Sequence, residues 1–163
     1  MIENVFFDFD GVLTLEDRGS TVTIGAIHSA RPDLSYQRIA DAYYRFHNDV
    51  LLGKHNHAAI WDEFCRVIGS KIDPSLLKVA FVATPMNVSM IDLARQLSAK
   101  YPIGIITANG SDRMEALVAE HNLTELFDPI VVSAHVGALK TERIIFDEAL
   151  NGRAPDHCAY IDN

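Results

Sequence analysis

Strand and helix signals alternate along the second half of the chain, and this alternation limits the fold more than any other feature. Short apolar runs suited to buried strands occupy residues 103–107, 130–132 and 158–161. Helical segments are expected at about 88–99, at 111–120 with Ser111 as its N-cap, and from a cap at Thr141 to Asn151. Strands joined through helices pair in parallel. We therefore predict an α/β protein whose parallel sheet carries helices on both faces.

A further strand is predicted at Val5–Phe9, but a long helical block separates it from the others. Residues 15–83 contain apolar positions three and four apart, which is the periodicity of amphipathic helices. Gly53 and Gly69 stand where two of these helices should end. The simplest architecture is an α/β core with a helical insertion after its first strand.

The composition excludes several classes of protein. Hydrophobic residues make up 48% of the 163 residues, which suits a folded domain, and the net charge of −8 makes nucleic acid an unlikely partner. Only two cysteines, Cys65 and Cys158, are present, as in a reducing compartment. No segment approaches 18 consecutive apolar residues, and the N-terminal residues do not form a signal peptide. We expect a cytoplasmic protein with no membrane span.

The segment FFDFDGVLT carries the strongest chemical signal. Asp8 and Asp10 lie at the carboxyl end of a predicted buried strand, where open α/β sheets bind ligands. Two carboxylates this close repel each other unless a cation, a shared proton or solvent intervenes. Mg²⁺ is the economical partner because it prefers oxygen ligands. A strand end followed by an ordinary Asp-Gly turn is the simpler alternative, and the second aspartate argues against it.

FFDFDGVLT resembles the first signature of the haloacid dehalogenase-like (HAD) hydrolase superfamily, apolar residues followed by DxDGxxT. Three more segments agree in order: IGIITANG, FDPIVVSAHVGALKTERIIFDEAL and AYIDN resemble the second, third and fourth signatures. The resemblance covers essentially the whole chain. It implies a Rossmann-like parallel sheet core formed by residues 1–14 and 86–163, and an all-helical cap formed by residues 15–85.

The resemblance also implies a catalytic role for each matching residue. Asp8 would be the nucleophile that forms an aspartyl-phosphate, and Asp10 the general acid and base. Thr107, with backbone N–H groups near Ala108 and Asn109, would hold the phosphoryl oxygens. Lys140 would neutralise charge beside Asp8 and the phosphate. The family often has Pro after this lysine, and we expect Thr141 to replace it as a helix cap.

The metal site implied by the resemblance is a Mg²⁺ held by Asp8, the backbone carbonyl of Asp10 and one residue of the fourth signature. That residue is Asp162 or, as an alternative that would remove one charge, Asn163. The family's sheet normally continues with another strand and helix. We therefore expect the carboxyl end to be truncated, with weaker Mg²⁺ binding and lower stability than in an extended chain.

Cap residues would choose the substrate. Arg18 is a candidate contact for a substrate anion, beside the simpler interpretation of a solvated loop arginine. His47, His55 and His57 invite a zinc site, but they do not share one helical face, and we interpret the 55–57 segment as a solvated cap loop.

The function predicted from these residues is a Mg²⁺-dependent phosphatase that hydrolyses a small phosphorylated metabolite through an aspartyl-phosphate. Relatives that cleave carbon–halogen bonds lack an acidic residue at the position of Asp10. Two alternatives stay open: a sugar phosphomutase of the same fold, and a catalytically weak or silent form that binds a ligand. The sequence leaves the substrate and the oligomeric state undetermined.

Overall fold

The computed structural model describes residues 1–163 and contains a four-stranded parallel sheet. Its strands are β1 (Asn4–Phe7), β2 (Ile103–Thr107), β3 (Ile130–Val132) and β4 (Cys158–Ile161). The strand order is β3-β2-β1-β4, so β1 pairs with β2 on one side and β4 on the other. The predicted α/β fold with a parallel sheet is confirmed.

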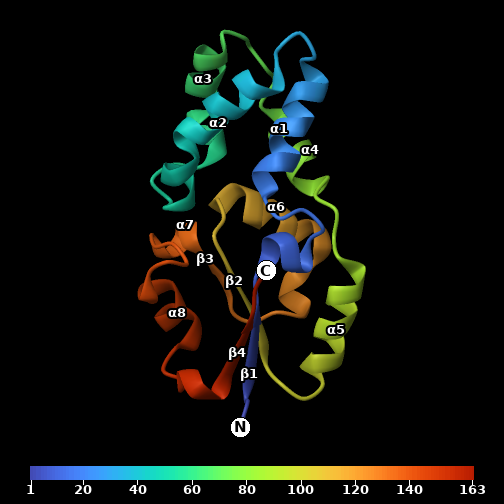
Figure 1. Ribbon diagram of the computed structural model, residues 1–163, viewed down its shortest axis with the longest axis vertical. Helices are drawn as coiled ribbons and strands as arrows, with labels where there is room; N and C mark the ends of the chain where they lie inside the picture. Colours follow the sequence, from blue (N-terminus) through green and yellow to red (C-terminus); the bar gives the residue numbers. More distant parts are fainter.

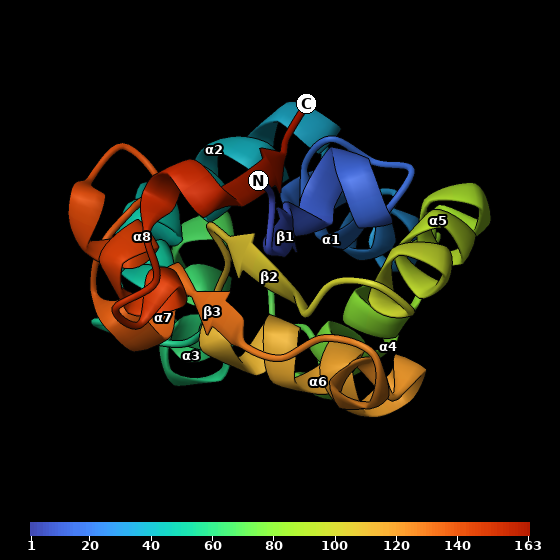
Figure 2. The same cartoon turned by 90° about the horizontal axis from the view of Figure 1, so that it is seen from below.

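Helices cover both faces of the sheet (Figure 2). On one face, α5 (Val88–Ser98) and α6 (Ser111–His121) pack on side chains from β1 and β2 that include Phe7 and Ile105. On the other face, α8 (Arg143–Leu150) packs on Phe6 and Ile106. Successive strand residues point to opposite faces, and both faces are buried, which explains the uninterrupted apolar runs in the sequence.

Four helices gather beyond the carboxyl ends of the strands (Figure 1). They are α1 (Gly19–Ala30), α2 (Tyr36–Leu51), α3 (His57–Ile68) and α4 (Ser75–Val82). Their apolar faces form a cluster of their own, distinct from the two clusters on the sheet. This separate cluster supports the proposed division into a core and a cap, and we call these four helices the cap below.

The two connections between core and cap run side by side. The Leu15 N–H donates to the Pro85 carbonyl, the Asn87 N–H donates to the Leu13 carbonyl, both at 2.9 Å, and an antiparallel bridge joins Thr14 to Met86. The chain therefore leaves and re-enters the core at one place, a few residues after Asp8 and Asp10.

Three predicted boundaries differ from the structure. The first strand ends at Phe7 instead of Phe9, because the backbone turns over residues 9–13 and Gly11 adopts a φ of 80°. Helix α6 is capped by Gly110 instead of Ser111. Helix α8 begins at Arg143 instead of directly after Thr141. A turn displaces its start: the Glu142 N–H donates to the Leu139 carbonyl, and the Glu142 carboxylate accepts from the Leu139 N–H, both at 2.9 Å.

The remaining elements are short. They are α7 (Ser133–Val136) and one-turn 3-10 helices at Leu123–Glu125 and Pro155–His157. None of the helices combines the length and the apolar character needed to cross a membrane.

The sheet core predicts a large loss of stability for Phe7→Ala. Phe7 is fully buried, and its ring meets the edge of Phe127 at a centroid distance of 5.9 Å. Truncation leaves a cavity, and we expect the free energy of unfolding to fall by about 3–5 kcal/mol. Val88→Ala is the control, since Val88 is 69% exposed, and it should change stability by less than about 0.5 kcal/mol. Urea unfolding followed by circular dichroism measures both, and equal losses would contradict this account of the core.

Candidate active site

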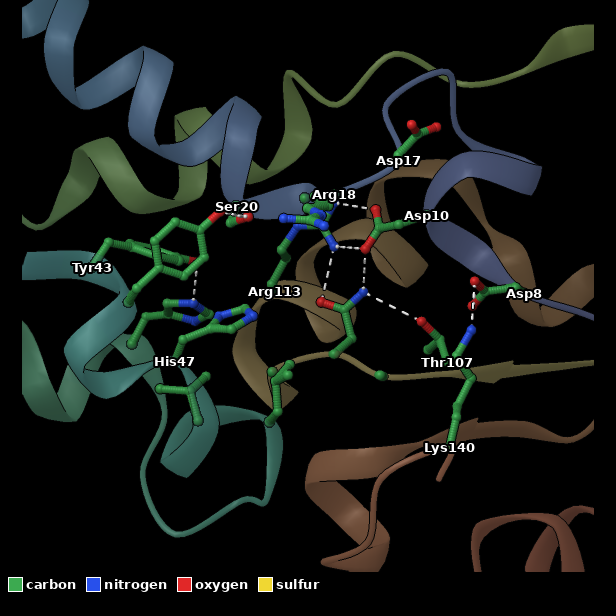
Figure 3. A pocket seen from close by; sticks show the side chains of 18 of the residues that line it. Asp8, Asp10, Asp17, Arg18, Ser20, Tyr43, His47, Thr107, Arg113 and Lys140 are labelled. Atoms are coloured by element: carbon green, nitrogen blue, oxygen red, sulfur yellow. Dashed lines mark hydrogen bonds and ion pairs between the residues drawn. The ribbon is translucent and has the colours of Figure 1, made fainter. Parts of the chain in front are cut away.

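A cavity of about 360 Å³ lies at the carboxyl ends of the strands, beneath the cap (Figure 3). The structure brings to it the residues predicted from the sequence: Asp8, Asp10, Arg18, Thr107, Ala108, Asn109 and Lys140. Asn163 also lines the cavity, and Asp162 reaches it through a contact with Lys140. The cap contributes the far wall, including Ser20, Tyr43, Tyr44 and His47.

Asp8 follows the last residue of β1 and is 5% exposed. Its backbone N–H donates to the Ile161 carbonyl at 2.8 Å, so β4 holds it in place. Lys140 Nζ donates to Asp8 Oδ2 at 2.7 Å. Burial raises the pKa of Asp8 to about 6, although the hydrogen bond from Lys140 acts in the opposite direction. A buried carboxylate beside a fixed cation is an arrangement suited to nucleophilic attack.

Lys140 connects two carboxylates. Besides Asp8, its Nζ lies 3.1 Å from Asp162 Oδ1. Burial opposes the positive charge, but the hydrogen bond to Asp8 raises the pKa of Lys140 above its ordinary value, so this lysine is a fixed cation. The pKa of Asp162 is lowered, against the effect of burial, by its hydrogen bond with Lys140.

Asp10 has a different cationic partner. Arg113 Nη1 donates to Asp10 Oδ2 at 2.9 Å and Arg113 Nη2 donates to Asp10 Oδ1 at 2.8 Å. Asn109 Nδ2 donates to the same Oδ2 at 3.0 Å. The two aspartates therefore turn apart in Figure 3, Asp8 toward Lys140 and Asp10 toward Arg113.

The segment after β2 is only partly as predicted. The Asn109 N–H, which we expected to hold a phosphoryl oxygen, donates instead to Ser133 Oγ at 2.9 Å. Ser133 is fully buried and also donates to the Leu51 carbonyl, so it joins this segment to the end of α2. Thr107 Oγ1 lies 3.5 Å from Asn109 Nδ2. Asn109 therefore contacts Asp10 and Thr107 in the cavity through its side chain and not through its backbone N–H.

The donors proposed for Mg²⁺ are hard oxygens, as that ion requires. Asp8 and Asp162 lie close enough to share Lys140, whereas the carboxylate of Asp10 is taken by Arg113. This leaves the backbone carbonyl of Asp10 as its contribution, as the sequence resemblance implied. The structure assembles no group of three or more His, Cys, Asp and Glu side chains suited to a metal. Two carboxylates and one carbonyl therefore remain the predicted donor set, and oxygen donors of this kind suit Mg²⁺.

His57 corrects the interpretation of the 55–57 segment as a solvated loop. It begins α3 and is 5% exposed, because its ring is held from both sides. Its Nδ1 lies 2.7 Å from Asp112 Oδ1 and its Nε2 lies 2.8 Å from the Tyr43 hydroxyl. Burial raises the pKa of Tyr43 above its ordinary value, so Tyr43 stays a neutral phenol. These contacts join the cap helices α2 and α3 to the core helix α6.

Arg113 is the residue that sequence reasoning missed. It lies in the first turn of α6, where the positive end of the helix dipole disfavours a cation. An arginine at that place requires a compensating anion, and this was the available signal. Its partner, 103 positions earlier in the chain, was not predictable from local pattern.

Known structures share this fold. No protein-family model and no curated protein matches the chain. A HAD family enzyme from Bacteroides thetaiotaomicron, solved as a magnesium complex, superposes with a TM-score of 0.80 at 18% identity over 99% of this chain and 83% of that one. This chain has the HAD-like fold. A predicted HAD-like hydrolase from Porphyromonas gingivalis gives a TM-score of 0.69 at 19% identity, covering 98% of this chain and 81% of that one.

The HAD-like fold includes enzymes of different chemistry. An L-2-haloacid dehalogenase from Xanthobacter autotrophicus superposes with a TM-score of 0.68 at 19% identity over 98% of this chain and 69% of that one. The choice of reaction therefore depends on the residues of the site and not on the fold.

The raised pKa of Asp8 predicts a titration that is directly measurable. In metal-free protein, the ¹³C signal of the Asp8 carboxyl should titrate with a midpoint near 6, well above the ordinary value of 3.8. Below this midpoint the metal-free protein holds Asp8 in its neutral form. Lys140→Met removes the neighbouring cation and should move the midpoint higher. A midpoint near 4 would contradict the conclusion that burial is the main influence on the pKa of Asp8.

Proposed function

We propose that the chain is a Mg²⁺-dependent phosphatase that hydrolyses a small phosphorylated metabolite through an aspartyl-phosphate. One observation carries the proposal: a buried Asp8 beside Lys140 shares a cavity with a second carboxylate, Asp10, whose orientation is fixed by other side chains. Hydrolysis of a phosphoester through a covalent intermediate needs a nucleophile, a fixed cation and a separate acid–base group.

The proposed reaction has two steps. In the first, Asp8 Oδ attacks phosphorus, the bond to the leaving oxygen breaks, and Asp10 gives that oxygen a proton. In the second, a water attacks phosphorus, the Asp8–phosphorus bond breaks, and Asp10 takes the proton of the water. Lys140 offsets negative charge on Asp8 and the phosphoryl group throughout, and Thr107 and the Ala108 N–H would hold phosphoryl oxygens.

Magnesium belongs to this proposal. Structures with this fold were solved with magnesium and, in two cases, with magnesium and inorganic phosphate. In this chain, Asp8, Asp162 and the Asp10 carbonyl would hold the ion, and it would supply positive charge to the phosphoryl oxygens.

Asp10 favours a phosphatase over a dehalogenase with the same fold. An alkoxide leaving group needs a proton, whereas a halide leaves as a stable anion and needs none. A second carboxylate held in the cavity by three side-chain hydrogen bonds has no evident use in carbon–halogen cleavage. The cavity of about 360 Å³ also limits the substrate to a small molecule.

Substitution of the two aspartates tests the covalent mechanism. Asp8→Asn should lower the turnover of a phosphate monoester by on the order of 10³-fold or more, since no nucleophile remains. Asp10→Asn should slow turnover by roughly 10²–10⁴-fold but still permit attack by Asp8. Asp17→Asn, which removes a carboxylate from the mouth of the same cavity, is the control and should have little effect. Phosphate release from a panel of phosphorylated metabolites, with and without Mg²⁺, measures all three. Near-normal turnover of Asp8→Asn would overturn the covalent mechanism, and release of halide from 2-haloacids would favour the dehalogenase.

Arg18 is proposed as a contact for the substrate anion. It is exposed at the cavity wall formed by the cap, so its charge acts through solvent. Arg18→Ala should raise KM by about fivefold with little change in kcat, which is the scale of an exposed charge pair. The effect should shrink as salt is added. Arg38→Ala, which removes an exposed arginine from α2 outside the cavity, is the control. Equal KM values for the two variants would place Arg18 outside the substrate site.

A further inference from the structure

Arg113 is the largest fully buried side chain of the protein. Its guanidinium donates four hydrogen bonds, two to Asp10 as described, one to Asn109 Oδ1 at 2.9 Å and one to Thr84 Oγ1 at 3.3 Å. Desolvating a charged group of this size is unfavourable unless the charge is paired and hydrogen-bonded. The chain has buried this arginine at the wall of the cavity, where its main partner is a carboxylate.

The pair with Asp10 fixes an orientation as well as a charge. Two parallel N–H donors contact the two carboxylate oxygens, which sets the plane of the carboxylate, and a single ammonium group does not do this. Asn109 completes the arrangement, since its Nδ2 donates to Asp10 and its Oδ1 accepts from Arg113. Each of the three side chains therefore restrains the other two.

We propose that Arg113 is a positioning residue, which holds the Asp10 carboxylate in the one orientation from which it serves the leaving oxygen and the attacking water. This inference rests on the proposed function and adds to it a residue whose guanidinium contacts Asp10 and not Asp8. A group held in place before the reaction avoids the loss of orientation that a freely rotating aspartate would suffer. Arg113 acts only through Asp10.

A purely structural role is the competing explanation. Thr84 belongs to the connection between cap and core, and Arg113 also packs against Gly19 at the start of α1. If Arg113 only joined these segments, its loss would reduce every activity of the enzyme equally. If it positions Asp10, the loss falls on the reactions that need proton transfer.

The positioning role and the purely structural role can be distinguished with substrates whose leaving groups differ in their need for a proton. 4-Nitrophenyl phosphate releases an anion that is stable without a proton, whereas 2-phenylethyl phosphate needs one. Single-turnover rates of leaving-group release report the first step alone. Arg113→Lys keeps the charge but loses the two-pronged contact, and it should lower the rate for the alkyl ester by roughly 10²-fold or more and the rate for the aryl ester by less than about tenfold. In an Asp10→Asn background, Arg113→Lys should cause no further selective loss of alkyl ester cleavage.

A second variant perturbs the same contact without changing Arg113. A Cβ atom at Gly19 would collide with the Arg113 guanidinium, so Gly19→Ala must displace it. Gly25→Ala is the matched control in the same helix, because a Cβ there meets nothing within 4 Å. Gly19→Ala should reproduce the selective loss of alkyl ester cleavage, and Gly25→Ala should leave both rates unchanged.

A measurement that needs no activity keeps the two proposals distinguishable. In metal-free protein, the paired guanidinium should rotate slowly and give separate Nη signals in ¹⁵N spectra, and Asp10→Asn should merge them. Separate signals with no ester cleaved by the native protein would contradict the proposed function alone. Equal losses for the aryl and alkyl esters in Arg113→Lys, or a selective loss that persists in the Asp10→Asn background, would overturn the positioning role.

Discussion

Asp8 is buried, Asp10 two residues later is partly buried, and two carboxylates this close repel each other unless each is paired with a cation. Asp8 pairs with Lys140 at 2.7 Å, and Asp10 pairs with Arg113 through two hydrogen bonds. Both aspartates lie where the chain leaves β1 and turns toward the cap, a turn in which Gly11 adopts a φ of 80°. Neither carboxylate would be stable in this place without the segment that brings its cation.

The parallel sheet explains where the cations come from. β2 runs beside β1, and β3 beside β2, all in the same direction, so the segments that follow β2 and β3 emerge at the end of the sheet where Asp8 and Asp10 lie. Lys140 follows β3 and Arg113 lies in the helix after β2. The site is therefore a consequence of strand direction, which brings together residues more than 100 positions apart in the chain.

The sequence predicted those parts of the site that depend on strand ends. Asp8 follows a predicted strand, Thr107 ends one, and Lys140 comes after a third. The resemblance to the HAD signatures implied that these three residues meet, and a parallel sheet is consistent with it. Arg113 and His57 lie on amphipathic helices, and their burial depends on which faces of those helices meet. That choice is made by packing between cap and core, which local periodicity does not encode.

Thr141 failed as a cap for a related reason. The Glu142 carboxylate accepts from the Leu139 N–H, and the turn formed in this way moves the start of α8 to Arg143. Side chains that hydrogen-bond to nearby backbone compete with helix initiation, and the outcome depends on small energy differences. Such a boundary is beyond prediction from residue type alone, although the helix itself was correctly expected.

The first turn of α6 connects the cap to Asp10, the proposed acid–base residue. Asp112 accepts a hydrogen bond from the Ala58 N–H, and its other oxygen lies 2.7 Å from His57 Nδ1. Ala58 and His57 are at the start of α3. Arg113, the neighbour of Asp112, holds Asp10 and contacts Thr84 in the connection from cap to core. A movement of the cap would therefore act on both ends of this turn at once. Through directional contacts, the Arg113 guanidinium thus links the carboxylate of Asp10 directly to the connection between cap and core.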